Sequence, residues 1–260
     1  MTGNDATGAV LAVIPARWGS TRFPGKPLAL VHGKPMIQCV WERVRQARGV
    51  DRVIIATDDA RILEAATAFG ADARMTRVDH ASGTDRAWEV AQTLAGYDWI
   101  LNVQGDEPQI DPAHLEAALK ARARWPQADI ITLASPIAAC QRDSITSDPN
   151  IVKVVLRGDG EALYFSRAPI PWRRDPQDAA SPIGPQALSQ AGLRHLGLYL
   201  YRREALARFT QWPPSVLEGI EKLEQLRALE NGLRVYVETV DRPAIGVDTP
   251  EDLAALLASG

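Results

Sequence analysis

Residues 9–27 read AVLAVIPARWGSTRFPGKP, an apolar run followed at once by a basic loop that contains glycine and proline. The run from Ala9 to Ile14 has no polar residue, a pattern typical of a strand covered on both faces, and we expect Pro15 to end it. Ligands of open α/β sheets bind at the carboxyl ends of the strands. The loop after this strand therefore lies where a ligand site is expected.

Outward from this strand, the chain alternates between helical and strand patterns. Met36, Ile37, Val40, Trp41 and Val44 recur at helical spacing. The elements predicted next are a strand at Val53–Ala56, a helix near Asp85–Leu94, a strand at Trp99–Val103, a helix at Pro112–Trp125 and a strand at Ile130–Leu133. This alternation predicts an α/β fold in which helices cover both faces of a mostly parallel sheet.

The pattern changes from Ile151 onward. Strand candidates at Ile151–Leu156 and Ala162–Phe165, joined by a turn at residues 157–160, predict a β-hairpin. Residues 175–192 are rich in Pro, Ala, Ser, Gly and Gln, and we expect a mobile surface loop or lid there. The remaining predicted elements are a strand at Leu196–Tyr201, a helix from about Ser215 to Glu230, a strand at Val235–Val240 and a short helix after Pro250.

The composition predicts a soluble protein built as one catalytic-sized unit. The 260 residues are 46% hydrophobic and 23% charged, and no apolar run approaches the ~18 residues of a membrane span. A net charge of −3 argues against a general nucleic-acid surface, since polyanion binding usually needs a basic excess. Met1 to Gly8 are typical of a disordered leader and not of a signal peptide, so we expect cytoplasmic residence. Cys39 and Cys140 are expected to be core thiols.

The basic loop has the composition of a phosphate-binding site. It carries three cations, two hydroxyls and two glycines that let the backbone approach a ligand, which suits a triphosphate. It does not match the Gly-x-x-x-x-Gly-Lys-Ser/Thr phosphate loop, and Pro24 and Pro27 forbid an immediate helix start of the type that follows such a loop. Taken alone, the segment is also compatible with a solvated basic loop.

Two aspartates lie just after predicted strands. They are Asp106 in NVQGDEP (residues 102–108) and Asp248 in GVDTP (residues 246–250). Their hard carboxylate oxygens could hold Mg²⁺ between the protein and phosphates. Each is alternatively a turn or helix-cap aspartate, and Asp248 in isolation would more often be a cap.

Six segments, in their order along the chain, resemble the signature blocks of the CMP-Kdo synthetases (3-deoxy-manno-octulosonate cytidylyltransferases). They are IPARWGSTRFPGKP (14–27), DHASGTDR (79–86), NVQGDEP (102–108), ALYFSRAPIPW (162–172), RHLGLY (194–199) and GVDTPEDL (246–253). Together they span nearly the whole chain after Gly8. Trp18 stands where the family often has Tyr, and Phe23 where Leu is common. No charged motif residue is missing.

The resemblance implies a Rossmann-like α/β domain of the nucleotide-diphospho-sugar transferase type. It would be a single catalytic domain over residues 9–260, with a smaller mixed α/β insert at about 151–212 that supplies sugar contacts and the surface of a homodimer. The implied reaction joins CTP and Kdo to give CMP-Kdo and pyrophosphate for lipopolysaccharide biosynthesis. The anomeric hydroxyl attacks the α-phosphorus, a displacement that depends on in-line positioning and charge neutralisation.

The resemblance also implies roles for individual residues. Arg17 and Lys26 would hold the phosphates, and Asp106 and Asp248 would bind the Mg²⁺ cofactor; these four are the expected catalytic residues. The residues expected to bind CTP are Arg17, Ser20, Arg22, Lys26, Ser82, Gly83, Arg86 and Gln104. The residues expected to bind the sugar are Arg167, His195, Tyr199, Glu221 and Gln225.

Several assignments have structural alternatives. Ser82 or Thr84 could cap the helix that follows, in addition to any role of this stretch beside the cytosine. Glu221 and Gln225 are four residues apart and could belong to a solvated helix face, and His195 could be structural. The opposite face of that predicted helix carries Val216, Ile220, Leu223 and Leu226. For the whole chain, the rivals are a cytidylyltransferase for another acid sugar, such as a sialic acid or an 8-amino Kdo analogue, and a non-catalytic nucleotide-binding protein.

Overall fold

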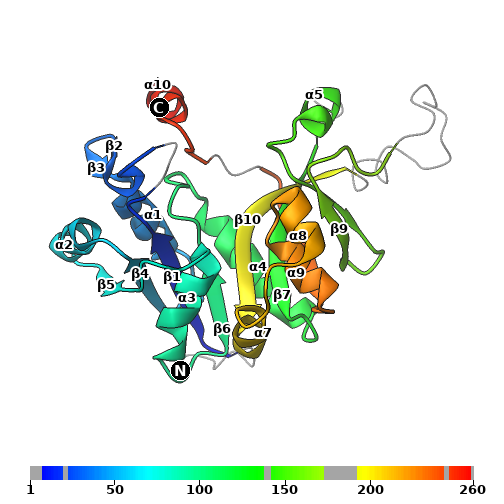
Figure 1. The fold of residues 1–260 in the computed structure, drawn as a ribbon, viewed down its shortest axis with the longest axis horizontal. Coiled ribbons are helices and arrows are strands. Elements are labelled where there is room, and N and C mark those ends of the chain that lie inside the picture. The colour runs from blue at the N-terminus through cyan, green and yellow to red at the C-terminus, as the bar shows by residue number, and fades with distance from the viewer. Residues whose placement is uncertain (1–7, 20–22, 138–141, 173–191, 243–245, 259–260) are drawn as a thin grey trace.

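The computed structural model describes residues 8–19, 23–137, 142–172, 192–242 and 246–258 (Figure 1). Outside the described residues lie Ser20, Arg22, Cys140, the expected leader up to Thr7 and the predicted loop up to residue 191. None of the helices in the described ranges is long and apolar enough to cross a membrane.

The described strands form a nine-stranded sheet with the order β11-β7-β10-β6-β1-β4-β5, and β8 and β9 continue from β10. The strands are β1 (Val10–Ala16), β4 (Arg52–Thr57), β5 (Asp72–Met75), β6 (Trp99–Asn102), β7 (Ile130–Pro136), β8 (Lys153–Leu156), β9 (Ala162–Ser166), β10 (Leu193–Arg202) and β11 (Val235–Thr239). β1 pairs in parallel with β4 and β6, β4 pairs in parallel with β5, and β7 pairs in parallel with β11. β10 is antiparallel to its neighbours β6 and β7. The prediction of a mostly parallel sheet is confirmed, as is the hairpin of β8 and β9.

The expected end of the first strand at Pro15 is wrong, because β1 continues to Ala16. Pro15 lies opposite Ala56 of β4, while the pairing with β6 already ends at Val13 and Asn102. Proline has no N–H to donate, and on the β6 side no strand is present at this level to receive one.

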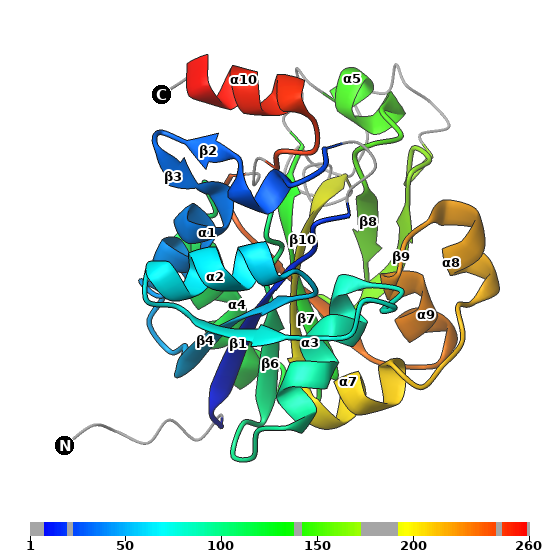
Figure 2. The same ribbon diagram turned by 60° about the vertical axis from the view of Figure 1, so that its left-hand side comes forward.

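Helices cover both faces of the sheet (Figures 1 and 2). The helices are α1 (Met36–Val44), α2 (Ala60–Ala68), α3 (Gly83–Gln92), α4 (Pro112–Arg124), α5 (Arg142–Ser147), α7 (Arg203–Phe209), α8 (Val216–Glu221), α9 (Gln225–Glu230) and α10 (Pro250–Ala258). Val10, Ala12 and Ile14 of β1 pack in one buried cluster with α1, α2 and α4. Leu11 and Val13 pack in the other with α3, α7 and α9. Alternate residues of β1 thus enter two cores, which explains why the whole run is apolar.

The single helix predicted from Ser215 to Glu230 is wrong, because the structure contains two short helices, α8 and α9, at this place. Lys222, the residue after α8, adopts a left-handed conformation with φ of 54°, and its N–H donates to the carbonyl oxygen of Glu218 at 2.8 Å. The change of direction lets Leu223 enter the core, whereas Val216 and Ile220 are each 73% exposed. The apolar face expected for one continuous helix is therefore split.

Short elements complete the chain around the sheet. η1 (Lys26–Leu28), β2 (Leu30–Val31) and β3 (Lys34–Pro35) lie between β1 and α1, and α10 is the helix predicted after Pro250. The sequence patterns predicted no counterpart for α2, β5, α5 or α7. β8, β9 and β10 all belong to the same nine-stranded sheet as β1. The bounds 151–212 of a separate insert stay a prediction.

Candidate active site

The loops that follow β1 and β6 meet at one edge of the sheet, because these two strands are neighbours. A Cβ at Gly105 would come within 2.8 Å of the carbonyl oxygen of Pro15. Backbone cannot yield as a flexible side chain can, so this close approach requires glycine. Arg17, the residue after β1, is exposed at the same edge, and Asp106 follows Gly105.

Lys26, the first residue of η1, joins the two aspartates that the sequence indicated. Its Nζ donates to Asp106 Oδ2 at 2.7 Å and to Asp248 Oδ1 at 3.4 Å. It also donates to the carbonyl oxygen of Val247 at 3.0 Å, and the Val247 N–H donates to the carbonyl oxygen of Asp106 at 2.9 Å. Asp106 and Asp248, which lie 80 and 222 positions after Lys26 in the sequence, thus meet at its ammonium group.

Asp248 is not the side chain that caps α10. The Asp252 carboxylate accepts from the N–H groups of Asp248 and Thr249, both at 2.9 Å, and the Asp252 N–H donates to Thr249 Oγ1 at 3.2 Å. The reciprocal pair of Thr249 and Asp252 has the form of a capping box. The Asp248 carboxylate, 51% exposed, instead faces the lysine.

Arg86 supports the basic loop from within the fold. Its side chain is 4% exposed and Nη2 donates to Asp58 Oδ2 at 2.9 Å. Its Nη1 contacts Thr76 Oγ1 and the carbonyl oxygen of Arg77. Asp58 Oδ1 also accepts from the N–H of Trp18 at 3.4 Å, so Arg86 reaches the loop through Asp58. The reading of cytosine by Arg86 stays a prediction, and these contacts favour a positioning role.

Ser82 caps α3, which confirms the alternative noted from the sequence. Its Oγ accepts from the Asp85 N–H at 3.1 Å, and the Asp85 carboxylate accepts from the Ser82 N–H at 3.1 Å. Gly83 packs on the ring of Pro15, where an added Cβ would lie 3.3 Å from Cγ. The capped end of α3 is therefore held against the end of β1.

Glu224 is a residue at this site that sequence reasoning missed. Its two carboxylate oxygens accept from Ser82 Oγ and Thr84 Oγ1, each at 2.9 Å. Thr84 Oγ1 also accepts from Asn102 Nδ2 at 3.1 Å. Burial raises the pKa of Glu224 and the two hydroxyls oppose the rise. One continuous helix gave no indication that Glu224 would contact α3. The break at Lys222 brings its carboxylate to Ser82 and Thr84.

Two of the expected sugar-binding residues, Arg167 and Glu221, lie in contact. The Glu221 carboxylate accepts from Ser166 Oγ at 2.6 Å and from the Arg167 N–H at 2.9 Å. The Arg167 guanidinium donates to the carbonyl oxygens of Glu221 at 2.7 Å and Pro149 at 2.8 Å. Gln225, the fifth expected residue, is buried at the start of α9 and no longer shares a helix with Glu221.

His195 and Tyr199 lie on β10 with ring centroids 5.4 Å apart. His195 Nε2 lies 2.9 Å from Thr132 Oγ1, and its ring meets Phe165 edge-on at 4.9 Å. Burial lowers the pKa of His195 to about 3, so the imidazole is neutral near pH 7. The tyrosine pKa is raised by burial and then by the charge of Glu224. The His195 imidazole and the Tyr199 hydroxyl are therefore both uncharged near pH 7.

Glu107 and Gln104 flank Asp106 from the same loop. Burial, and next the charge of Asp106, raise the pKa of Glu107 to about 7, against the opposing charge of Arg194. Gln104 lies beside β10, since a Cβ at Gly197 would be 3.8 Å from its Cγ. The loop after β6 thus carries its polar groups between β1 and the strand that bears His195.

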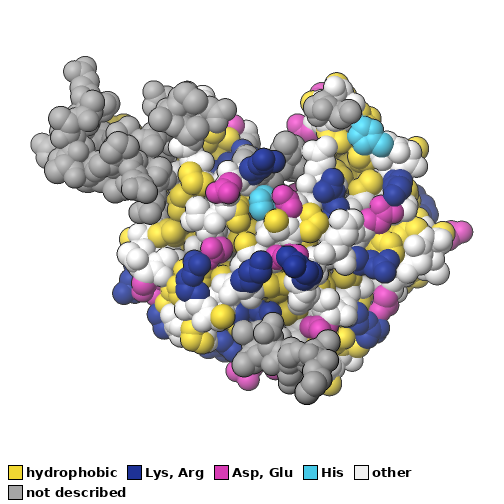
Figure 3. All heavy atoms as spheres, turned by 180° about the vertical axis from the view of Figure 1, so that it is seen from behind, with side chains coloured by type: hydrophobic (Ala, Val, Ile, Leu, Met, Phe, Trp, Pro, Cys, Tyr) yellow, Lys and Arg dark blue, Asp and Glu magenta, His cyan; other side chains and the backbone are white. Residues whose placement is uncertain are grey.

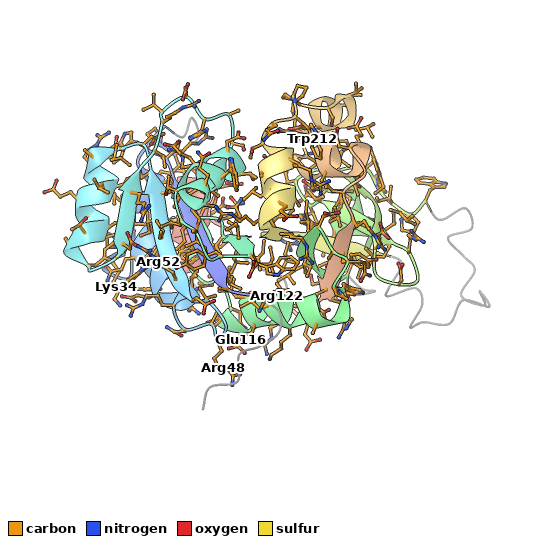
Figure 4. All side chains as sticks on the ribbon, turned by 90° about the horizontal axis from the view of Figure 1, so that it is seen from below. Lys34, Arg48, Arg52, Glu116, Arg122 and Trp212 are labelled. Atoms are coloured by element: carbon orange, nitrogen blue, oxygen red, sulfur yellow. The ribbon has the colours of Figure 1, made fainter. Side chains whose placement is uncertain are left out.

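A separate cavity of about 330 Å³ lies at the opposite, amino ends of β4 and β5, and Arg52 and Asp72 line it. Arg52 is labelled in Figure 4. Ligand sites of open α/β sheets lie at the carboxyl ends. The edge that carries Lys26, Asp106 and Asp248 is therefore the candidate active site. A mostly parallel sheet with a basic loop, a lysine and paired carboxylates at this edge is the arrangement expected of a nucleotidyltransferase, which must neutralise a triphosphate and its leaving group.

The comparisons with known proteins agree with this class. The chain matches the cytidylyltransferase family over residues 11–238. It is 50% identical to the 3-deoxy-manno-octulosonate cytidylyltransferase of Syntrophotalea carbinolica over 96% of this chain and 98% of the relative, and 51% identical to that of Pelobacter propionicus over 94% of each. The solved structure of a CMP:2-keto-3-deoxy-manno-octonic acid synthetase complexed with CTP superposes with a TM-score of 0.86 at 43% identity, covering 96% of this chain and 98% of the other. The chain belongs to the 3-deoxy-manno-octulosonate cytidylyltransferase (CMP-Kdo synthetase) family.

Proposed function

We propose that this protein transfers CMP from CTP to the anomeric hydroxyl of Kdo and releases pyrophosphate. The observation that carries the proposal is the meeting of Lys26, Asp106 and Asp248 at the carboxyl edge of the sheet. Relatives that are 50% and 51% identical to this chain, and that cover 96% and 94% of it, are named for this reaction. The reaction needs a triphosphate and a sugar hydroxyl in line, with little covalent chemistry from the protein.

Asp106 and Asp248 are the residues that would hold Mg²⁺. Their oxygens already share one cation, the Lys26 ammonium, and hard carboxylate oxygens are the ligands that Mg²⁺ prefers. No group of three or more His, Cys, Asp or Glu suited to a metal occurs among the described residues, so substrate oxygens and water would complete the shell. When bound, the metal would stabilise charge on the α-phosphate and lower the pKa of the sugar hydroxyl.

The protein's own residues divide the work between the two substrates. Arg17 and Lys26 neutralise the triphosphate and the departing pyrophosphate. The capped end of α3, with Ser82 and Gly83, forms the wall beside the cytosine. Gln104, on the loop after β6, completes that side.

The Kdo side is formed by the residues around β10. The sugar carboxylate would be received by Arg167, because a planar guanidinium can bind a carboxylate through two N–H groups. The sugar hydroxyls would be received by His195, Tyr199, Glu221 and Gln225. Neutral His195 can both donate and accept a hydrogen bond, which suits a hydroxyl.

We further propose a cytoplasmic homodimer whose product feeds lipopolysaccharide synthesis. Support for a dimer comes from large apolar side chains exposed on and after β9 and on α8. They are Leu163 at 57%, Trp172 at 80%, and Val216 and Ile220 at 73% each. Exposed apolar groups of this size often mark a protein interface, and the occupant we propose is a second copy of this chain.

Pyrophosphate release tests the reaction. Purified protein with Mg²⁺ and CTP should release pyrophosphate only when Kdo is present, and ATP, GTP or UTP should not replace CTP. A panel of acid sugars, including a sialic acid and an 8-amino Kdo analogue, tests the substrate assignment. A strong preference for another sugar would overturn Kdo, and CTP binding without release on any sugar would favour a non-catalytic protein.

A further inference from the structure

The ammonium of Lys26 is fully engaged by the wall of the site. A lysine ammonium has three N–H donors. Asp106, Val247 and Asp248 supply three acceptor oxygens, at 2.7, 3.0 and 3.4 Å. In this arrangement every donor points at the protein, so Lys26 has no N–H left for a phosphate.

A divalent cation held by Asp106 and Asp248 would need carboxylate oxygens that Lys26 uses. Mg²⁺ binds carboxylate oxygens at roughly 2.0–2.1 Å, and two cations sharing these oxygens would repel each other. The Lys26 side chain is 14% exposed, so water screens this repulsion less than at an open surface. Lys26 therefore cannot keep its hydrogen bonds to both aspartates while a metal is bound to the same two carboxylates.

Only the side chain of Lys26 has to move to resolve the conflict. Its backbone starts η1 directly after Gly25, whose N–H donates to the carbonyl oxygen of Trp18 at 3.2 Å. The Trp18 ring packs over Gly25, and the Arg61 guanidinium lies 3.4 Å from the centroid of that ring. The flexible four-carbon stem can turn while this base stays in place.

We infer that Lys26 and a divalent cation compete for the Asp106–Asp248 pair, and that the triphosphate relieves the competition by drawing Lys26 to itself. Lys26 then has two successive duties: it holds the carboxylates together, and it neutralises the phosphates once the metal replaces it. The triphosphate half of this inference rests on the proposed function. The order that follows is nucleotide before, or together with, metal.

Mn²⁺ binding without nucleotide or sugar tests the competition. Electron paramagnetic resonance titration of free Mn²⁺ should show Lys26→Met binding Mn²⁺ on the order of tenfold more tightly than wild type, because a competing charge is removed from a partly screened site. Lys34→Met is the matched control. Lys34 of β3 pairs instead with Glu42 of α1 at 2.7 Å, whereas the hydrogen bonds to Asp106 and Asp248 come from Lys26. Lys34→Met should therefore leave Mn²⁺ affinity unchanged.

Equal or weaker Mn²⁺ binding by Lys26→Met would overturn the competition. If that variant does not fold by circular dichroism, Lys26→Gln is judged by the same criterion, since its amide can still donate to Val247. CTP binding by calorimetry in metal-free buffer tests the second half: Lys26→Met should bind CTP about tenfold more weakly, and unchanged affinity would contradict the transfer to phosphate. None of these titrations contains Kdo, so a wrong sugar assignment leaves them intact.

Discussion

At the scale of single residues, the two aspartates at Lys26 separate what the sequence could predict from what it could not. Their place after strands, together with the family resemblance, predicted that Asp106 and Asp248 act together. The sequence alone left Asp248 open as a helix cap. The geometry assigns that cap to Thr249 and Asp252, because their reciprocal bonds are formed without the Asp248 side chain. Which side chain caps the helix depends on loop geometry that no local sequence pattern contains.

Asp106→Asn should lower kcat by about a hundredfold or more, because it removes the carboxylate charge that would hold the metal beside the reacting phosphate. The fold should persist, because asparagine has the same size as aspartate. Steady-state pyrophosphate release and thermal unfolding measure the two effects. Asp72→Asn is the control. Asp72 pairs with Arg52 at the amino end of the sheet, and its loss should leave turnover unchanged. Full activity of Asp106→Asn would remove the metal-site assignment.

His195 makes a pH-dependent contribution to stability. Its pKa is about 3 in the folded protein, against an ordinary value of 6.5. Between these values the unfolded chain binds a proton that the folded protein does not, so the free energy of unfolding falls as pH drops below about 6.5. The slope from this one group is at most about 1.4 kcal/mol per pH unit.

His195→Gln should therefore be less sensitive to acid than wild type, since its amide is neutral and can keep the bond to Thr132. Urea unfolding at several pH values between 7 and 4.5 measures the difference. Wild type should lose stability relative to the variant as pH falls through this range. Parallel pH profiles for the two proteins would show that folding leaves the pKa of His195 unchanged, which would contradict its lowering by burial.

At the scale of elements, regular periodicity predicted β1, α1, α3, α4 and the β8–β9 hairpin, because each buries one repeating face or a whole apolar run. It missed α2, which buries only Ile62 and Ala66. It also joined α8 and α9, because the apolar spacing continues across Lys222. Tertiary contacts override that spacing: Leu223 is buried and Glu224 binds Ser82 and Thr84.

The base of the basic loop depends on the fit between Gly25 and Trp18. Gly25→Ala should weaken CTP binding and cost about 1 kcal/mol or more of stability, because φ is +70° and the new Cβ would lie 3.0 Å from the tryptophan ring. Gly33→Ala is the matched control, with φ of +82° and nothing within 4 Å of an added Cβ. It should share the backbone cost and keep CTP affinity. Calorimetry with CTP and thermal unfolding decide; equal CTP affinity in both variants would contradict the account.

At the scale of the whole molecule, local sequence patterns could not predict the order of the strands in the sheet. β10 inserts antiparallel between β6 and β7, and this places His195 and Tyr199 beside the loop that carries Asp106. The resemblance predicted that these residues share a site, while hydrophobic periodicity gave no indication of it. Basic and acidic side chains are interspersed over the face seen in Figure 3. The expectation that nucleic acid is not a partner stays a prediction.

If the proposed dimer forms through this surface, one substitution in it should lower the molecular mass of the particle in solution from dimer to monomer. Wild type should elute as a dimer by size exclusion with light scattering, and Ile220→Glu should shift it toward monomer, because a charge would be buried in an apolar interface. Val78→Glu is the control. Val78 is 77% exposed on the segment between β5 and α3 and should leave the dimer intact. A monomeric wild type, or an Ile220→Glu dimer, would contradict this surface.

Phosphorus NMR of one reaction mixture tests the central claim most directly, because it observes the bond that forms and the bond that breaks. With Mg²⁺, CTP and Kdo, the α-phosphorus signal of CTP should be replaced by that of the CMP-Kdo phosphodiester, and pyrophosphate should appear in equal amount. Without Kdo the CTP signals should persist. Cleavage of CTP without Kdo, or unchanged CTP in the complete mixture, would contradict the transfer of CMP to the sugar.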